Sequence, residues 1–372
     1  MPAHKKSVEN DNKHVDIAMN KPKTKKIRVA ILALDDVPVT TVTGPHDVFA
    51  QVGVQWQMVN HVQPDPRFEV EIITPDGLPV RAFNDVIITP HRAMSDSTPD
   101  LITIPGVLDI EQAVAKYGRV IEWLQEQHAQ GILLAAICTG SMLLAETGLL
   151  NGKIATTHWG WVDLFRKRYP EVLLKPDELI TDAGDLFCSG AFNSFLDLSI
   201  YLVEKLCGLE TASHCAKVLI HDIGRSSQAP YTTFCQQHDH GDAMIIELQN
   251  ILERNFSHPV DFNRLAKKHG MGRRTLERRF KKATGNTPLE YLQRVRVEQA
   301  KTLLESGHRS FDEISFHVGY EDSGFLRKLF AKHAGLLPSE YRARFSRKPL
   351  KNFKVEENSL ESSHERNNDL NP

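Results

Sequence analysis

The sequence contains no long uninterrupted apolar run. A helix that crosses a membrane needs roughly 18 to 20 consecutive apolar residues, and every apolar stretch in this 372-residue chain is shorter. The first 26 residues also lack the apolar segment of a secretory signal peptide. These absences predict a cytoplasmic protein with no membrane partner.

Cysteine is also scarce, and its spacing excludes two common uses of the residue. None of the five cysteines belongs to a CxxC pair, the spacing that holds many structural zinc ions. An intracellular chain with so few cysteines is not a disulfide-stabilised scaffold. We therefore expect no metal site, no disulfide framework and no cofactor. The five are Cys138, Cys188, Cys207, Cys215 and Cys235.

Charge is close to balanced over the whole chain, with a net charge of −2, but it is unevenly distributed. Residues 243–348 hold 21 lysines and arginines against 12 acidic residues, whereas residues 27–242 hold 14 against 27. A basic module beside an acidic body predicts that only the module faces a polyanion.

Residues 27–208 show short apolar runs that alternate with helical patterns. Strands that alternate with helices predict an α/β domain with a parallel sheet covered on both faces. The runs expected to form strands are 27–34, 68–74, 100–106 and 131–138. The segments expected to form helices are 120–129, 141–148 and 161–169.

The composition divides the chain into five parts. Residues 1–26 and 349–372 are polar and predict disordered tails. We expect the α/β domain to cover residues 27–224, a polar linker to follow over 225–241, and an all-α domain to cover 242–348.

The all-α region contains an internal repeat. Each copy predicts a short helix, a glycine-containing turn, a second helix and a Gly-x-x-Pro exit, which is the pattern of a helix-turn-helix module. A long helix from Pro288 to Gly307 should join the two copies. Leu265, Gly270, Leu276, Phe280, Gly285, Pro288 and Tyr291 correspond to Ile314, Gly319, Leu326, Phe330, Gly335, Pro338 and Tyr341.

The second helix of the first module is strongly basic. Because Leu276 and Phe280 share its inner face, the basic side chains around them should point outward. Arginine can bridge guanine bidentately, while lysine mainly contacts phosphate. A merely solvated basic face is the alternative, but this helix is the one that helix-turn-helix geometry places in the major groove. The predicted DNA contacts are Arg273, Arg274, Thr275, Arg278, Lys281 and Lys282, with Arg327, Lys328 and Lys332 on the less basic helix of the second module.

Residues 272–304 and 314–342 resemble the AraC/XylS family of bacterial transcription regulators. The departures are Gly272, where the family often has a serine cap, and Ser315, where alanine is usual. The resemblance implies a regulator that binds promoter DNA through two successive major grooves. It also implies RNA polymerase as a partner and a homodimer.

A cysteine stands at the end of an apolar run, in the sequence Cys138-Thr139-Gly140-Ser141. A cysteine on a strand-to-helix turn gains from the helix N-terminal field, which favours the thiolate. A small buried hydrophobe is the structural alternative.

Residues 43–50, 103–107, 135–161 and 182–204 resemble the ThiJ/PfpI branch of the glutamine-amidotransferase-like fold, which is flavodoxin-like. They look most similar to the sensor domains of GlxA-type regulators and to isonitrile hydratases. The resemblance places Cys138 at the nucleophile-elbow position. It implies an anion-binding site from the N–H groups of Thr139 and of Gly106 or Val107, with His158 and Trp159 nearby.

Two departures from that resemblance argue against catalysis and leave Cys138 as a vestigial nucleophile. Thr41 stands where hydratase-type relatives have an acidic residue, and Thr139 stands where protease-like members have histidine. Asp35 or Asp36 could replace the missing acid only if it reached the reacting group.

We therefore expect a ligand-responsive transcription regulator that is not an enzyme. The resemblance suggests an activator of catabolic genes with an amine or amino acid as effector. Trp56, Trp159 and Trp161 could cage a quaternary ammonium, or they could belong to the core. A cysteine-dependent hydratase or amidase, and a thiol redox sensor, are the alternatives.

Overall fold

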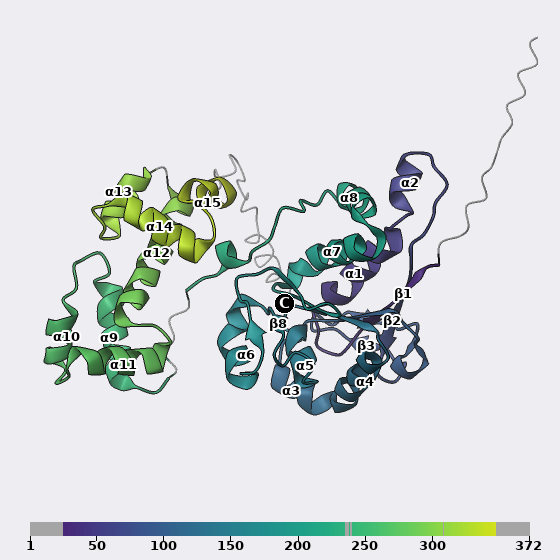
Figure 1. The fold of residues 1–372 in the computed structure, drawn as a ribbon, viewed down its shortest axis with the longest axis horizontal. Coiled ribbons are helices and arrows are strands. Elements are labelled where there is room, and N and C mark those ends of the chain that lie inside the picture. Colours follow the sequence, from purple (N-terminus) through teal and green to yellow (C-terminus); the bar gives the residue numbers. More distant parts are fainter. Residues whose placement is uncertain (1–24, 235–237, 239, 308, 347–372) are drawn as a thin grey trace, which may run out of the picture. The chain divides into compact units, whose positions relative to one another are not determined.

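The computed structural model describes residues 25–234, 238, 240–307 and 309–346. These residues form two compact units that divide between Gln228 and Ala229, inside the predicted linker 225–241 (Figure 1). The predicted tails lie outside the described residues, apart from Lys25 and Lys26. Within the described ranges, no helix has both the length and the apolar composition needed to cross a membrane.

The first unit is built on a seven-stranded sheet with the order β10-β11-β7-β6-β1-β2-β5. All neighbouring strands run parallel except β10, which is antiparallel to β11. The predicted α/β fold with a mainly parallel sheet is therefore confirmed. The strands are β1 Ile27–Leu32, β2 Phe68–Thr74, β5 Arg92–Ala93, β6 Leu101–Ile104, β7 Leu133–Ile137, β10 Ile180–Asp182 and β11 Leu186–Ser189.

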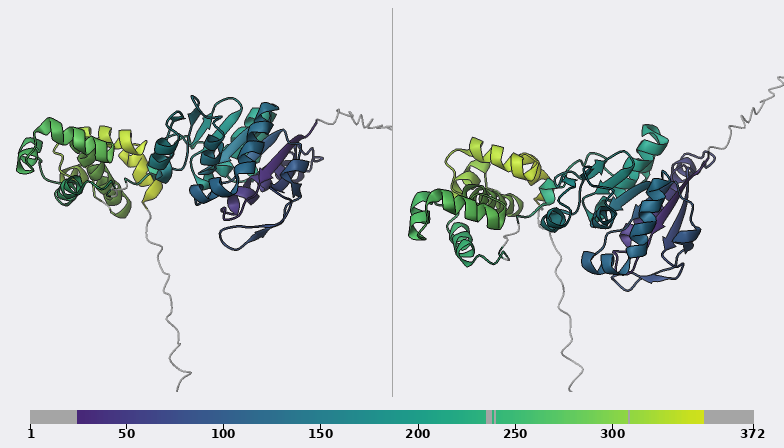
Figure 2. Two further views of the ribbon diagram at one scale, coloured as in Figure 1. Left: turned by 90° about the horizontal axis from the view of Figure 1, so that it is seen from below. Right: turned by 60° about the horizontal axis from the view of Figure 1, so that its bottom comes forward.

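Helices cover both faces of this sheet. Figures 1 and 2 show α1, α7 and α8 on one face and α3, α4 and α5 on the other. The central strands are consequently buried on both sides, and Ile31, Leu101 and Leu134 are fully inaccessible to solvent. This explains why those strands are continuous apolar runs rather than alternating patterns.

The first unit also contains two small sheets and several short helical turns. The pair β3 Val80–Arg81 and β4 Ile87–Ile88 is antiparallel, and the pair β8 Ile154–Ala155 and β9 Leu173–Leu174 is parallel. The helices are α1 Thr40–Gln51, α2 Gln55–Val59, α3 Ile110–Lys116, α4 Gly118–Ala129, α5 Gly140–Glu146, α6 Val162–Arg168, α7 Phe195–Cys207 and α8 Leu209–Val218. The 3-10 turns are η1 Met94–Asp96, η2 Trp159–Trp161 and η3 Phe192–Ser194.

The second unit is helical throughout, as predicted. Its elements are η4 Ala229–Tyr231, α9 Ala243–Arg254, α10 Phe262–Lys268, α11 Arg273–Thr284, α12 Pro288–Ser306, α13 Phe311–His317, α14 Ser323–Ala334 and α15 Pro338–Phe345. The joining helix α12 begins with a reciprocal cap: Thr287 accepts the Glu290 N–H at 3.3 Å, and Glu290 accepts the Thr287 N–H at 2.8 Å.

The sequence repeat reappears as a repeated packing contact. In the first module the buried Phe280 of α11 meets Tyr291 with ring centroids 5.3 Å apart. In the second module the buried Phe330 of α14 meets Tyr341 at the same distance, and both contacts are edge-to-face. The two modules therefore have separate but equivalent cores, which fixes α11 and α14 as corresponding helices.

Candidate functional site

The outer face of α11 carries the basic side chains expected from the sequence. Leu276 and Phe280 are fully buried, whereas Arg274, Arg278 and Lys281 are exposed. Lys282, Arg273 and Thr275 are exposed too. The helix ends at Gly285, whose φ of 73° closes it in the left-handed region.

Not every positive charge on α11 is equally available. Arg279 holds the carboxylate of Asp242 with two hydrogen bonds, of 2.6 and 2.8 Å, and this contact lowers the pKa of Asp242. Arg273 pairs with Glu277 at 2.9 Å. Among the described residues, no ion pair involves Arg274, Arg278, Lys281 or Lys282, so a phosphate or a base edge can engage these four without breaking an ion pair there.

The corresponding helix α14 offers fewer charges. Arg327, Lys328 and Lys332 are exposed, and the guanidinium of Arg327 lies 5.5 Å from the ring centroid of Phe311. The N-terminus of α14 is capped by Asp322, which accepts the Gly324 N–H at 2.8 Å. A carboxylate at this end reduces the local positive potential, so α14 presents a weaker electrostatic surface than α11.

Arg296 on α12 connects the two modules and was not identified from the sequence. Its guanidinium donates to the carbonyls of Phe256 and His258, which precede α10, at 2.7 and 3.1 Å. It also donates to the carbonyl of Gly319, in the turn of the second module, at 3.1 Å. Only 8% of Arg296 is exposed, and its guanidinium also lies 4.6 Å from the ring centroid of Tyr320. A single buried cation therefore holds both modules to the joining helix.

In the first unit, Cys138 occupies the sharp turn between β7 and α5. Its φ of 56° lies in the left-handed region, which is rare for a side chain other than glycine. The turn is held by the Cys138 N–H, which donates to the Ser189 carbonyl at 2.9 Å, and by the Ser141 hydroxyl, which donates to the Cys138 carbonyl at 2.8 Å. This strained strand-to-helix turn has the form expected of a nucleophile elbow.

Thr139 joins this turn to the segment after β6. The Val107 N–H donates to Thr139 Oγ1 at 2.9 Å, and the Thr139 hydroxyl donates to the Val107 carbonyl at 2.5 Å. The Val107 N–H is therefore already used within the chain. Of the two alternatives given by the sequence, Gly106 remains as the donor that would join Thr139 at an anion site.

The thiol of Cys138 is held in its neutral form. Only 7% of the residue is exposed, and burial raises its pKa to about 11, although hydrogen bonds from Thr139 act in the opposite direction. The expectation that the helix terminus would favour a thiolate is therefore wrong. Removal of the thiolate from water outweighs the hydrogen bonds that Thr139 supplies at this turn.

This pKa predicts low thiol reactivity. At pH 7.5 we expect iodoacetamide to modify Cys138 more than about 100-fold more slowly in the folded chain than in the urea-unfolded chain, because only the thiolate reacts. Mass spectrometry of the Cys138 peptide gives both rates. Equal rates in the two states would restore the redox-sensor alternative.

His158 is the N-cap of η2, and Trp159 is the first residue of that turn. Their rings stack with centroids 5.2 Å apart, and His158 Nδ1 accepts the Gly160 N–H at 3.1 Å. Burial lowers the pKa of His158, so its ring is neutral at physiological pH. Among the described residues, no hydrogen bond joins His158 to Cys138, so the structure does not form a cysteine–histidine dyad.

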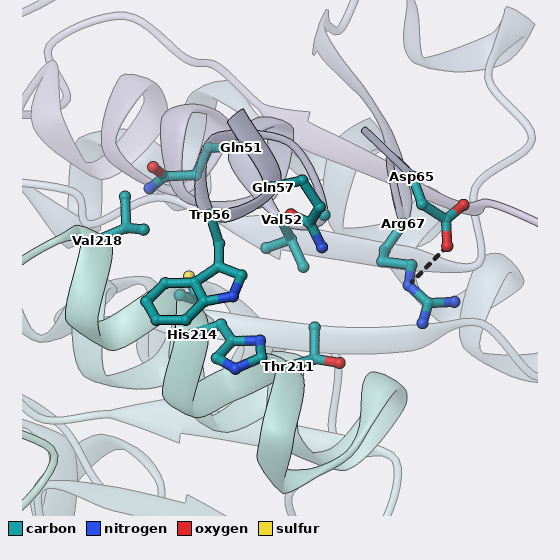
Figure 3. Close-up of a pocket in the computed structure, with 11 residues that line it drawn as sticks. Gln51, Val52, Trp56, Gln57, Asp65, Arg67, Thr211, His214 and Val218 are labelled. Atoms are coloured by element: carbon teal, nitrogen blue, oxygen red, sulfur yellow. Dashed lines mark ion pairs between the residues drawn. The ribbon is translucent and has the colours of Figure 1, made fainter. Parts of the chain in front are cut away.

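Trp56 lies elsewhere in the unit, on α2. Figure 3 shows its indole stacked on the imidazole of His214 from α8, with centroids 4.2 Å apart and planes 8° from parallel. The Lys217 ammonium lies 5.6 Å from the Trp56 ring centroid. Trp159 and Trp161 belong to η2, which directly precedes α6. Helix α2, which carries Trp56, and helix α6 lie at opposite ends of the unit in Figure 1. The three tryptophans therefore cannot form one cage, which requires every ring within about 6 Å of the cation.

Gln228 is a further polar residue that contacts the loop containing His158. Its side chain is buried and its Oε1 accepts the N–H of Trp159 at 3.3 Å. No sequence pattern indicated this role, because Gln228 stands in a polar segment predicted to be a linker.

Comparison with known proteins assigns families to the two units. Residues 27–204 match the model of the DJ-1/PfpI family, and residues 265–344 match a helix-turn-helix domain model. The HTH-type transcriptional regulator GbdR of Pseudomonas aeruginosa is 26% identical over 290 residues, which cover 77% of this chain and 78% of that protein. The chain carries a DJ-1/PfpI domain followed by an AraC-type helix-turn-helix domain.

Two further relatives share parts of this architecture. The HTH-type transcriptional regulator CdhR of Pseudomonas aeruginosa is 26% identical over 274 residues, covering 73% of this chain and 81% of that protein. The isonitrile hydratase of Pseudomonas putida is 28% identical over 189 residues, covering 50% of this chain and 75% of the enzyme. The DJ-1/PfpI domain thus occurs both in regulators and in an enzyme.

Two positions in the DJ-1/PfpI domain of this chain bear on the general acid that hydratase chemistry needs. Thr41, at the position expected to hold a carboxylate, is buried on α1 and donates to the Pro38 carbonyl at 2.7 Å. Asp35 is paired with Lys116 at 2.8 Å. Burial raises the pKa of Asp35, but the hydrogen bonds from Lys116 and from the Arg81 N–H outweigh burial, so the pKa of Asp35 is lowered overall. Asp35 is therefore ionised at neutral pH and cannot act as a general acid.

Proposed function

We propose that this protein is a ligand-responsive, sequence-specific DNA-binding transcription regulator. The observation that carries the proposal is the basic face of α11, whose Arg274, Arg278, Lys281 and Lys282 have no ion-pair partner among the described residues and project from a buried helix-turn-helix core. The relatives that align with both units are named as transcriptional regulators, which supports the same function.

DNA contacts divide between the two modules by charge and by side-chain type. Arg274 and Arg278 have the guanidinium geometry that matches guanine edges, and Lys281 and Lys282 supply phosphate contacts. On α14, Arg327, Lys328 and Lys332 grip the backbone or read fewer bases. In this proposal α11 and α14 enter two successive major grooves of promoter DNA in the cytoplasm. We also propose that the protein is a homodimer that contacts RNA polymerase and activates catabolic genes.

The DJ-1/PfpI domain acts as the sensor rather than as an enzyme. Gly106, Cys138 and Thr139 line the turn, and His158 and Trp159 contribute the neighbouring loop. The neutral thiol of Cys138 and the absence of an acid at Thr41 argue against the hydratase or amidase alternative. A bound metabolite changes promoter affinity to the extent that it favours one of two arrangements of the chain.

Calorimetric titration of the full chain with a panel of amines and amino acids tests the sensor. We expect one member to bind saturably and to change promoter affinity by about 5-fold or more. The Arg278→Ala variant should bind this ligand unchanged, since Arg278 lies in the other unit. A ligand that saturates the sensor without altering promoter affinity would contradict a regulatory role, and no binding by any member would exclude this effector class.

A further inference from the structure

The last residue of the first unit inserts its side chain into that unit. Gln228 is only 1% exposed, although it ends a polar segment that leads to the DNA-binding unit. We propose that the pocket around its amide, here called the carboxamide socket, is a binding site for a primary carboxamide. In this structure Gln228 fills the socket, and an effector that carries the same group competes with it.

The contacts of the socket match both ends of a carboxamide. Gln228 Nε2 donates to the Thr157 carbonyl at 2.8 Å, to Thr156 Oγ1 at 3.2 Å and to the Glu178 carbonyl at 3.4 Å. On the other side, Gln228 Oε1 accepts the Trp159 N–H at 3.3 Å. The socket therefore offers acceptors to an NH2 group and a donor to the adjoining carbonyl oxygen.

The shape of the socket also selects a flat group. A Cβ atom built on Gly190 would lie 2.3 Å from Gln228 Nε2 and 2.9 Å from its Oε1, so the amide is in close contact with the Gly190 backbone. Any other residue at 190 would occupy the space of the amide. Gly190 directly follows Ser189, whose carbonyl accepts the Cys138 N–H at 2.9 Å. The socket thus adjoins the Cys138 turn and shares Trp159 with the predicted effector site.

Two buried hydroxyls belong to residues that border the socket: Thr157, whose carbonyl accepts from Gln228, and Ser189, which precedes Gly190. Thr157 Oγ1 and Ser189 Oγ are inaccessible to solvent and have no hydrogen-bond partner within the described part of the chain. Buried polar atoms without partners cost free energy unless a ligand or water satisfies them. They provide further hydrogen-bonding positions for a molecule whose carboxamide replaces that of Gln228.

The segment that carries Gln228 is anchored at several points. At one end Asp197 of α7, itself 7% exposed, accepts hydrogen bonds from Arg225 and lies 3.2 Å from His221 Nε2. Further along, the Leu179 N–H donates to the Ser226 carbonyl at 3.0 Å. The Gln228 side chain is the last of these side-chain attachments before the second unit. The Gln228 N–H also donates to the Asp177 carbonyl at 3.0 Å, so displacement of the side chain would leave the segment held there by its backbone alone.

The socket discriminates between chemical classes. A carboxylate has no N–H for the carbonyls of Thr157 and Glu178, and an ammonium has no acceptor for the Trp159 N–H. A primary carboxamide satisfies both requirements and is planar. The binding of a carboxamide to the socket does not depend on the proposed function. The claim that this binding changes the response of the regulator does rest on the proposed function.

Replacement of Gln228 by alanine should empty the socket and make it available to a small amide. In the full-length Gln228→Ala variant we expect propionamide to raise the Tm of the first unit saturably, by about 3 °C. Propionate, which has the same shape but lacks the NH2 donors, should have no effect. In the matched Gln228→Leu variant the side chain fills the space, so propionamide should not stabilise that variant.

Equal stabilisation of Gln228→Ala by propionamide and propionate, or none by either, would overturn the socket. If Gln228→Ala does not fold, the Gln228→Glu variant replaces it. Glutamate keeps the length of the side chain but lacks the N–H donors. Hydrogen exchange of residues 225–234 should then be faster in this variant than in the wild type. Unchanged exchange would overturn the assignment. Propionamide binding to the wild type without any change in promoter affinity would retain the socket and overturn its regulatory role. If the wild type fails to bind DNA, the proposed function fails while the propionamide result stands.

Discussion

Replacing Arg296 by methionine is expected to lower the stability of the helical unit by about 3 kcal/mol. The methionine keeps most of the stem but removes the guanidinium, which leaves the carbonyls of Phe256, His258 and Gly319 without their donors. Loss of a buried charged donor costs a few kcal/mol in comparable cases. In a unit of about 100 residues this corresponds to a fall in Tm of more than about 10 °C, which calorimetry of the full chain can measure.

The same variant should also lose simultaneous contact with two grooves. Arg296 holds the loop before α10 and the turn before α14 to one helix, so its loss frees the two modules from each other. The control is Arg264→Met, which removes the same charge from an exposed position on α10 and should leave Tm nearly unchanged. If the Arg296→Met variant has the same Tm as the Arg264→Met control, the buried cation does not hold the modules together.

Replacing Arg278 by alanine is expected to remove discrimination at one base pair of the DNA site. An arginine that bridges a guanine contributes about 1 to 3 kcal/mol at that base pair. The wild type should therefore prefer the correct base pair to a mutated one by up to about 100-fold, and the variant should lose this preference. Arg274→Ala should act in the same direction at a neighbouring base pair. Fluorescence anisotropy with single-base-pair variants of the site gives the comparison.

Lys281→Ala provides the matched control for Arg278→Ala. A phosphate contact carries no direct sequence information, so its loss should weaken all sites equally and reduce the salt dependence by about one counterion. Both residues are exposed on α11, and removal of either side chain should leave the Leu276 and Phe280 core intact. If Arg278→Ala behaves like Lys281→Ala, α11 grips the backbone and does not read bases.

The organisation of the helical unit was predictable because its information is local. The repeated spacing of Leu276 and Phe280, and of Leu326 and Phe330, specifies one buried stripe per helix, and the structure places all four side chains in the two cores. The capping pair Thr287 and Glu290 is equally local. Arg296 could not be found this way, because its partners lie 23 to 40 residues away in the sequence.

In the first unit the main strands were predictable, but the properties of the site were not. The apolar runs of β1, β2, β6 and β7 are visible in the sequence, whereas the four-residue β11 depends on pairing with β7. The turn at Cys138 was correctly located, but its raised pKa depends on burial by distant elements. The contact of Trp56 with His214 joins residues 158 positions apart and is not visible in the sequence. Trp56 was therefore assigned to a possible cage.

Footprinting of the wild-type protein on its promoter DNA tests the central claim most directly. If α11 and α14 enter two successive major grooves, hydroxyl-radical cleavage should show two protected stretches about one helical turn, or 10 to 10.5 base pairs, apart. The stretch under α11 should contain the base pairs that Arg278→Ala no longer discriminates. A single protected stretch would contradict a two-module reader, and the absence of any sequence-specific protection would contradict the DNA-binding function itself.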